Sequence, residues 1–88
     1  MDQFVELISK PIADAFFPLV FKNLVKDKMY DPERNARIYD YVYNTVSTKV
    51  KEYFTANPLT TKQEVDFGIQ EIIVELFIIF ELFVSFLM

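Results

Sequence analysis

The residues in this sequence that could do chemistry are carboxylates set in an apolar segment at the end of the chain. Residues 71–88 read EIIVELFIIFELFVSFLM, in which Glu71, Glu75 and Glu81 interrupt a run of large apolar side chains. A carboxylate in such surroundings could pair with a cation, or could carry a proton if burial raised its pKa. All nine Lys and Arg residues lie at or before Lys62. The cations that neutralise these glutamates must therefore come from earlier in the chain or from another molecule.

The residue types that are missing exclude most other chemistry. The chain has no cysteine and no histidine, which rules out disulfides, thiolate metal sites and the Ser/His or Cys/His pairs of nucleophilic catalysis. Without histidine, the Glu-x-x-His pattern of carboxylate di-iron proteins is also impossible. A single glycine excludes glycine-rich phosphate loops, and a net charge of −4 is unsuited to nucleic acid, which binds clustered Lys and Arg. We therefore expect no enzyme activity, no cofactor, no metal and no nucleic-acid partner.

The elements that position the glutamates are predicted to form one small all-α domain, residues 1–88, with three helices. In residues 1–28, apolar side chains recur at three- and four-residue spacing, while Pro11 and Pro18 indicate a short amphipathic turn followed by a kinked or restarted helix. Residues 60–88 contain no stop signal, so one long apolar helix is expected there.

The middle segment, residues 31–56, is predicted to be an amphipathic helix. Asp31 can act as its N-cap, and Pro32 suits the first helical position. The alternating tyrosines of YDYVY also permit a strand, but the length of the segment and its start signal favour a helix. Its apolar stripe has four-residue spacing and comprises Ile38, Val42, Val46, Val50 and Phe54.

The last helix, whose start is marked by the capping-box spacing of Thr61 and Glu64, is close to the limit for a membrane span. Residues 72–88 make about 25 Å of helix, against a hydrocarbon core of roughly 30 Å. Their Leu, Ile, Phe and Val side chains favour insertion by roughly 4–8 kcal/mol in total, whereas each acid near the helix centre costs about 2.5–3.5 kcal/mol. The three glutamates share a sector of about 140° with Gln70 and Ser85. We expect a membrane-embedded helix whose acidic stripe faces protein; the alternative is the central helix of a soluble bundle with its glutamates at the solvent edge.

These patterns indicate contact residues, and none that is catalytic. Glu71, Glu75 and Glu81 are predicted to pair with Arg or Lys of a partner subunit. Lys22 and Lys26 are expected near lipid head groups. The anchors that face lipid or a partner are predicted to be the phenylalanines of the last helix, namely Phe77, Phe80, Phe83 and Phe86.

Several short motifs occur in the same order as in a known protein family. They are IYDYV around Tyr39, the pair Glu71 and Glu75 ahead of an apolar run, and two blocks: SKPIA (Ser9, Lys10, Pro11, Ile12 and Ala13) and NPLT, which begins with Asn57, Pro58 and Leu59. In this order the chain resembles the optic atrophy 3 protein family of small mitochondrial membrane proteins. It departs from that family where Ile69 and Val74 replace glycines, and it stops before the family's terminal acidic-aromatic motif and charged extension, as a divergent, truncated relative would. The resemblance implies a mitochondrial location and membrane association, with no catalytic activity.

The function predicted from these observations is that of a non-catalytic accessory subunit of a mitochondrial inner-membrane assembly, such as a respiratory-chain complex or the ATP synthase. Its partners would be other subunits and the lipid bilayer. A soluble helical-bundle interaction or regulatory protein is the alternative. Proton or ion translocation through Glu75 or Glu81 is a minor alternative, because the small residues that pack such membrane hairpins tightly are missing.

Overall fold

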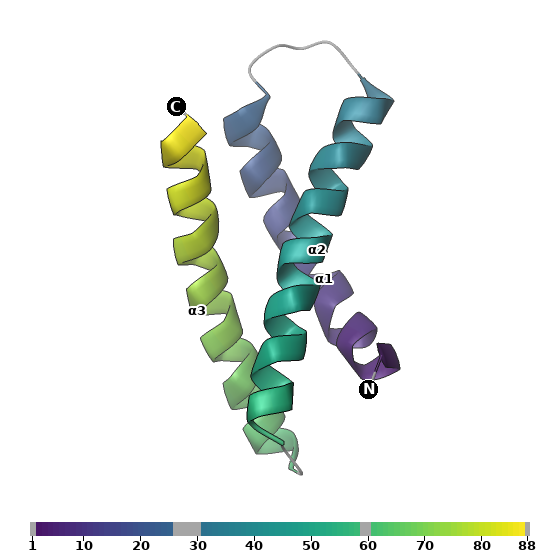
Figure 1. Cartoon of the computed structure of the whole chain (residues 1–88), viewed down its shortest axis with the longest axis vertical. Helices are drawn as coiled ribbons and strands as arrows, with labels where there is room; N and C mark the ends of the chain where they lie inside the picture. The colour runs from purple at the N-terminus through teal and green to yellow at the C-terminus, as the bar shows by residue number, and fades with distance from the viewer. Residues whose placement is uncertain (1, 26–30, 59–60, 88) are drawn as a thin grey trace.

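Three helices make up nearly all of the described chain. The computed structural model describes residues 2–25, 31–58 and 61–87, and within these ranges it contains helices and no strand (Figure 1). The helices are α1 (Asp2–Leu24), α2 (Pro32–Ala56) and α3 (Lys62–Leu87). They run alternately up and down, so α1 and α3 are parallel and α2 is antiparallel to both (Figure 1). The all-α prediction with three helices is confirmed, and the strand alternative for the middle segment is excluded.

The starts of α2 and α3 are capped by the side chains that the sequence predicts as caps. The Asp31 carboxylate accepts a hydrogen bond of 3.1 Å from the backbone N–H of Arg34, and Pro32 follows as the first helical residue. The Thr61 hydroxyl donates to the Glu64 carboxylate at 2.9 Å and accepts from the Glu64 backbone N–H at 3.2 Å. These bonds satisfy backbone donors that have no partner within a helix.

The first helix is continuous through both of its prolines. Pro11 and Pro18 lie inside α1 and are exposed, so the carbonyls that lose a helical donor to them can bond water. The structure agrees with the kinked alternative of the prediction, because the axis of α1 changes direction after its first turns (Figure 1), and it shows neither a separate turn nor a restart of the helix. Packing of one face of α1 into the core offsets the cost of the missing backbone bonds.

The core runs along the middle of the bundle and takes residues from all three helices. The predicted stripe of α2 is its spine, because the stripe's valines have no exposed surface. Ser9 and Ala13 of α1 are also fully buried, and these small side chains let α1 approach α2 closely. Contact between α1 and α2 is the most extensive in the bundle, and contact between α1 and α3 is the least. The buried apolar residues are Val5, Ile12, Ala13, Phe16, Val20, Val42, Val46, Val50, Phe54, Ile72, Leu76 and Phe80.

The only glycine of the chain lies where α3 packs on α2. Gly68 is buried, and a Cβ placed on it would lie 2.6 Å from Cε1 of Tyr53 and 3.3 Å from Cε1 of Phe54. The absence of a side chain at this position therefore allows α3 to pack directly over the two rings.

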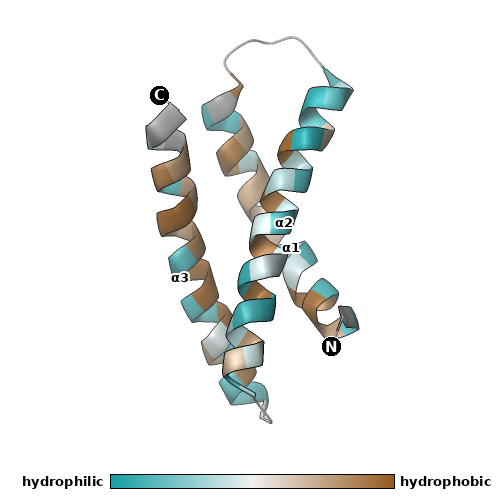
Figure 2. Cartoon of the chain, viewed as in Figure 1, coloured by the Kyte–Doolittle hydropathy of each residue, from teal (hydrophilic) through white to brown (hydrophobic). Residues whose placement is uncertain are grey.

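Apolar residues cover most of α3, and hydrophilic positions recur along it (Figure 2). Within the parts of the chain that the structure describes, no helix combines the length and the apolar character needed to cross a membrane.

Candidate interaction surface on α3

The side of α3 that points away from the bundle carries both apolar and acidic residues. Its core side is formed by Ile72, Leu76 and Phe80, which are at most 4% exposed. On the opposite side lie four residues that are each more than half exposed, which we call the apolar row: Phe67 (60%), Val74 (60%), Ile78 (54%) and Leu82 (66%). Their spacing of seven, four and four residues keeps them on one side of the helix. Glu75 and Glu81 lie on either side of this row, and Glu71 falls within its sector.

Two of the three glutamates are engaged by α2. Lys49 Nζ lies 3.2 Å from Oε2 of Glu75, and the Tyr53 hydroxyl donates a hydrogen bond of 2.9 Å to Oε2 of Glu71. That hydrogen bond is the main reason why the pKa of Tyr53 is raised, since ionising the phenol would lose the bond and place two negative charges together. Lys49 and Tyr53 are four residues apart on α2, as are Glu75 and Glu71 on the antiparallel α3. The two pairs therefore face each other in register.

The third glutamate has no such partner. Glu81 is exposed, and no cation or hydrogen-bond donor pairs with its side chain among the described residues. It lines a hollow of about 370 Å³ between α1 and α3, together with Asn23 and Ser85. Of the three glutamates predicted to pair with a partner subunit, Glu81 is the one that the described chain leaves unpaired.

The predicted aromatic anchors pack mainly within the chain. Phe80 is buried in the core, and Phe77, half exposed, meets the ring of Phe16 edge-on with centroids 4.9 Å apart. Phe83 stacks on Tyr41 at 4.6 Å. The side chain of Phe86 lies outside the described residues. The side of α3 opposite the apolar row is the side that α1 and α2 cover, and these rings pack against those two helices.

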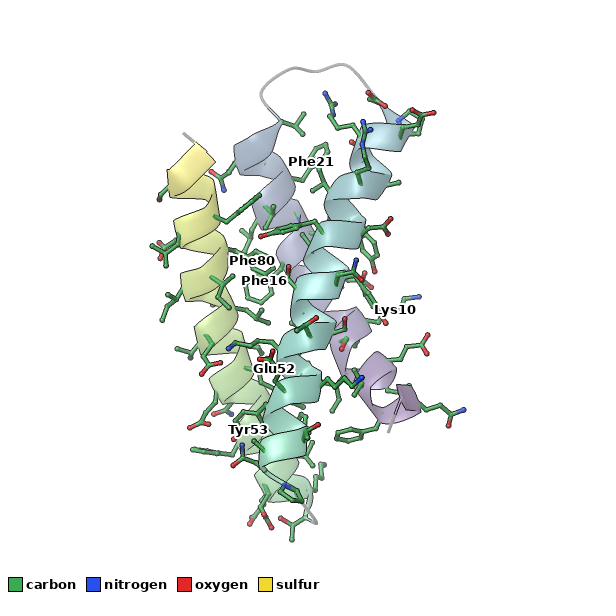
Figure 3. The ribbon with its side chains drawn as sticks, viewed as in Figure 1. Lys10, Phe16, Phe21, Glu52, Tyr53 and Phe80 are labelled. Atoms are coloured by element: carbon green, nitrogen blue, oxygen red, sulfur yellow. The ribbon has the colours of Figure 1, made fainter. Side chains whose placement is uncertain are left out.

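The N-terminal motif SKPIA divides between the core and the surface. Ile12 and Ala13 are core residues, and Ser9 is buried with its Oγ lacking a hydrogen-bond partner in the described structure. Lys10 and Pro11 are exposed and line a hollow of about 640 Å³ on the outer side of α1. Figure 3 shows the side chain of Lys10 directed away from the bundle.

The remaining predicted positions are at helix ends. Asn57 caps α2 through a 2.9 Å hydrogen bond from its backbone N–H to the carbonyl of Tyr53, and Pro58 follows it, exposed. Lys22 is exposed in the last turn of α1. Lys26 and Leu59 lie outside the described residues.

Two features were not predicted from the sequence. The apolar row could have been found from its spacing, but the large number of apolar residues in α3 concealed it. The second feature is a hydrogen bond of 2.8 Å from the Tyr39 hydroxyl to Oδ1 of Asp14, which joins α2 to α1 and raises the pKa of Tyr39. Only the register between helices reveals that bond, and the sequence carries no direct signal for it.

Nothing among the described residues forms a cluster of three or more acidic side chains that could hold a metal ion. The outer side of α3 therefore combines an exposed apolar row, two carboxylates engaged within the chain and one that is unpaired among the described residues. A scan against protein-family models and searches of curated proteins and of solved structures found no match to this chain.

Proposed function

We propose that this chain is a non-catalytic accessory subunit that binds a partner protein through the apolar row of α3. The observation that carries the proposal is the exposure of Phe67, Val74, Ile78 and Leu82, each more than half accessible on one side of one helix. Burying what remains exposed of each side chain would contribute on the order of 1 kcal/mol. An exposed row of this kind, rimmed by charge, is typical of a protein interaction surface.

The spacing of the row favours a partner that offers a groove. A helix that binds in a groove places anchors three, four or seven residues apart, as the row does. The acidic flanks call for Lys or Arg at the rim of that groove, and Glu81 is the carboxylate best placed to meet such a cation because it has no partner among the described residues. Charge pairs of this kind contribute orientation and specificity more than affinity.

The assembly that we propose is a membrane complex of the mitochondrial inner membrane, in which α3 is embedded beside partner subunits. This part of the proposal is supported by the resemblance to the optic atrophy 3 family. In such a setting the partner would cover the carboxylates, which are costly in lipid unless they are paired.

The test is affinity capture of the tagged full chain from its own cells in mild detergent, with a matched pair of variants. Val74→Gln/Ile78→Gln removes two members of the row without touching the core. Thr48→Gln alters an exposed position on α2 and serves as the control. We expect the partner to be recovered with the wild type and the control and lost with the double variant. Equal recovery with all three chains would refute the proposal.

A soluble helical interaction or regulatory protein is the second candidate. It is favoured by the closed core and by the position of Glu71, Glu75 and Glu81 on the exposed side of α3. Carbonate extraction of membranes separates the two candidates. A chain embedded in a membrane assembly stays in the pellet, whereas a soluble module appears in the supernatant. In both cases the Val74→Gln/Ile78→Gln variant tests whether the apolar row binds the partner.

A further inference from the structure

A groove runs between α1 and α3, where the bundle has its least extensive helix contact. It consists of two hollows, of about 370 Å³ and about 390 Å³, that share Phe16, Leu19 and Phe77 as walls. The second hollow continues toward the N-terminus of α1 and is lined only by apolar residues, namely Pro11, Ile12, Ala15, Phe16, Leu19, Ile73 and Phe77. The apolar row is on another side of α3, and of the residues named for the partner surface only Glu81 also lines this groove.

The other end of the groove is polar and aromatic. Asn23, Glu81 and Ser85 line the first hollow together with three phenylalanine rings. The ring centroid of Phe16 lies 4.9 Å from that of Phe77 and 5.1 Å from that of Phe80. Figure 3 shows Phe16 and Phe80 directed toward each other between the two helices. Phe16 and Phe80 are buried, but Phe77 is half exposed, and an exposed ring beside an unpaired carboxylate can hold an organic ammonium ion.

We propose that this groove binds a single-chain lipid with a phosphocholine head group. Its alkyl tail would lie in the apolar hollow toward Pro11, and its ammonium group would lie against Glu81 and the rings. Lys22 is exposed in the same last turn of α1 as Asn23, where it is available to a phosphate. An occupant with one charged end and one apolar end fits this groove, because its polar lining residues are confined to the first hollow. This inference goes beyond the proposed function and does not depend on a partner protein.

The experiment is a titration of the purified, isotopically labelled full chain with dodecylphosphocholine below its micelle concentration, followed by methyl NMR. Dodecyl maltoside, which has the same tail and an uncharged head, is the comparison ligand. We expect saturable binding of dodecylphosphocholine with shifts at Leu19, Val20 and Ile73, and binding of the maltoside that is at least about threefold weaker.

The variants make the result specific. Glu81→Gln should weaken dodecylphosphocholine binding by about threefold to tenfold. Glu75→Gln makes the same change in net charge on the α2 side of α3, where it pairs with Lys49, and should leave binding unchanged. Lys22→Gln should weaken binding of the phosphocholine ligand and leave that of dodecyltrimethylammonium, which has no phosphate, unchanged.

Three outcomes would overturn the assignment. They are equal affinity for the phosphocholine and the maltoside, equal effects of Glu81→Gln and Glu75→Gln, and shifts centred on Val74 and Ile78 of the apolar row. The last outcome would mean that the amphiphile covers the proposed partner surface. If the wild-type chain captures its partner but does not bind dodecylphosphocholine, this inference alone is refuted. If it binds dodecylphosphocholine but captures no partner, the proposed function alone is refuted.

Discussion

A tyrosine hydroxyl on α2 supplies the hydrogen-bond donor for the first glutamate of the apolar segment. Tyr53 donates to Glu71 across the α2–α3 contact, and Tyr39 does the same for Asp14 across the α1–α2 contact. The middle helix thus holds both neighbours through neutral phenols. A phenol can donate to a carboxylate without adding charge, and it does so only while it keeps its proton.

The residue-scale prediction concerns alkaline pH. Because the pKa of Tyr39 and that of Tyr53 are raised above 10.0 in the folded state, the stability that these bonds contribute is fully present below pH 10 and is lost as pH rises through the folded pKa values. We expect the free energy of unfolding to fall as the pH rises above 10, as measured by urea denaturation followed by circular dichroism.

The control for this prediction is another tyrosine. The double variant Tyr39→Phe/Tyr53→Phe should be less stable at neutral pH and should show a shallower decline at alkaline pH. Tyr43→Phe removes a hydroxyl that makes no hydrogen bond with the described residues, and its decline should match that of the wild type. If the double variant declines as steeply as the wild type, the two bonds do not contribute to stability.

At the scale of the element, the residues at which helices start were predictable from local sequence, whereas the face that each helix turns toward its neighbours was not. Asp31 with Pro32, and Thr61 with Glu64, marked the starts of α2 and α3 because capping involves neighbours in sequence. The continuity of α1 through its prolines was not predictable, because the packing that offsets the lost bonds is tertiary. For the same reason, Phe77 and Phe83 were expected to face lipid or a partner, and their rings instead meet rings of α1 and α2.

Gly68 provides a prediction about the contact between two elements. In an isolated helix, replacing glycine by alanine is stabilising by about 1 kcal/mol. In this bundle the added Cβ would lie 2.6 Å from the Tyr53 ring and displace it, and overpacking of this kind costs about 1–3 kcal/mol. We expect Gly68→Ala to reduce the free energy of unfolding and to weaken the Tyr53–Glu71 hydrogen bond.

The control for that prediction is Gln70→Ala, at an exposed position two residues along α3. This change should leave stability the same or slightly higher, as helix propensity alone requires. Urea denaturation of both variants measures the difference. A Gly68→Ala chain that is more stable than the wild type would show that α3 does not pack closely on the Tyr53 ring.

At the scale of the whole molecule, the bundle is slender, with extents of 46 × 24 × 16 Å, and its last helix is covered on one side only. The sequence predicted three helices and the core stripe of α2, because periodicity within one helix reports which residues share a face. It did not reveal which face of α3 the bundle covers, since apolar residues occur on both the covered and the exposed sides of that helix. The unequal contacts that leave the groove beside α1 are likewise a property of the assembled fold.

A matched pair of isoleucines on α3 tests this orientation. Ile72 has no exposed surface, whereas Ile78 is 54% exposed. Ile72→Ala should reduce the free energy of unfolding by about 2–5 kcal/mol. Ile78→Ala should change it by less than about 1 kcal/mol, because most of the methyl groups removed are already in water. Chemical denaturation of the purified chain measures both values, and a reversed order would place the opposite face of α3 in the core.

The two contacts between α2 and α3, Lys49 with Glu75 and Tyr53 with Glu71, limit the positions that α3 can take along α2. The two acceptors, Glu71 and Glu75, are chemically identical. Either donor can therefore donate to either carboxylate. A slide by four residues, about 6 Å, would still bring one donor opposite one carboxylate, but it would leave the second donor without an acceptor. Exchanging the two donor residues would keep both bonds and the alignment. The alignment of α3 along α2 therefore depends on the distance between the two donors and not on their order in the sequence.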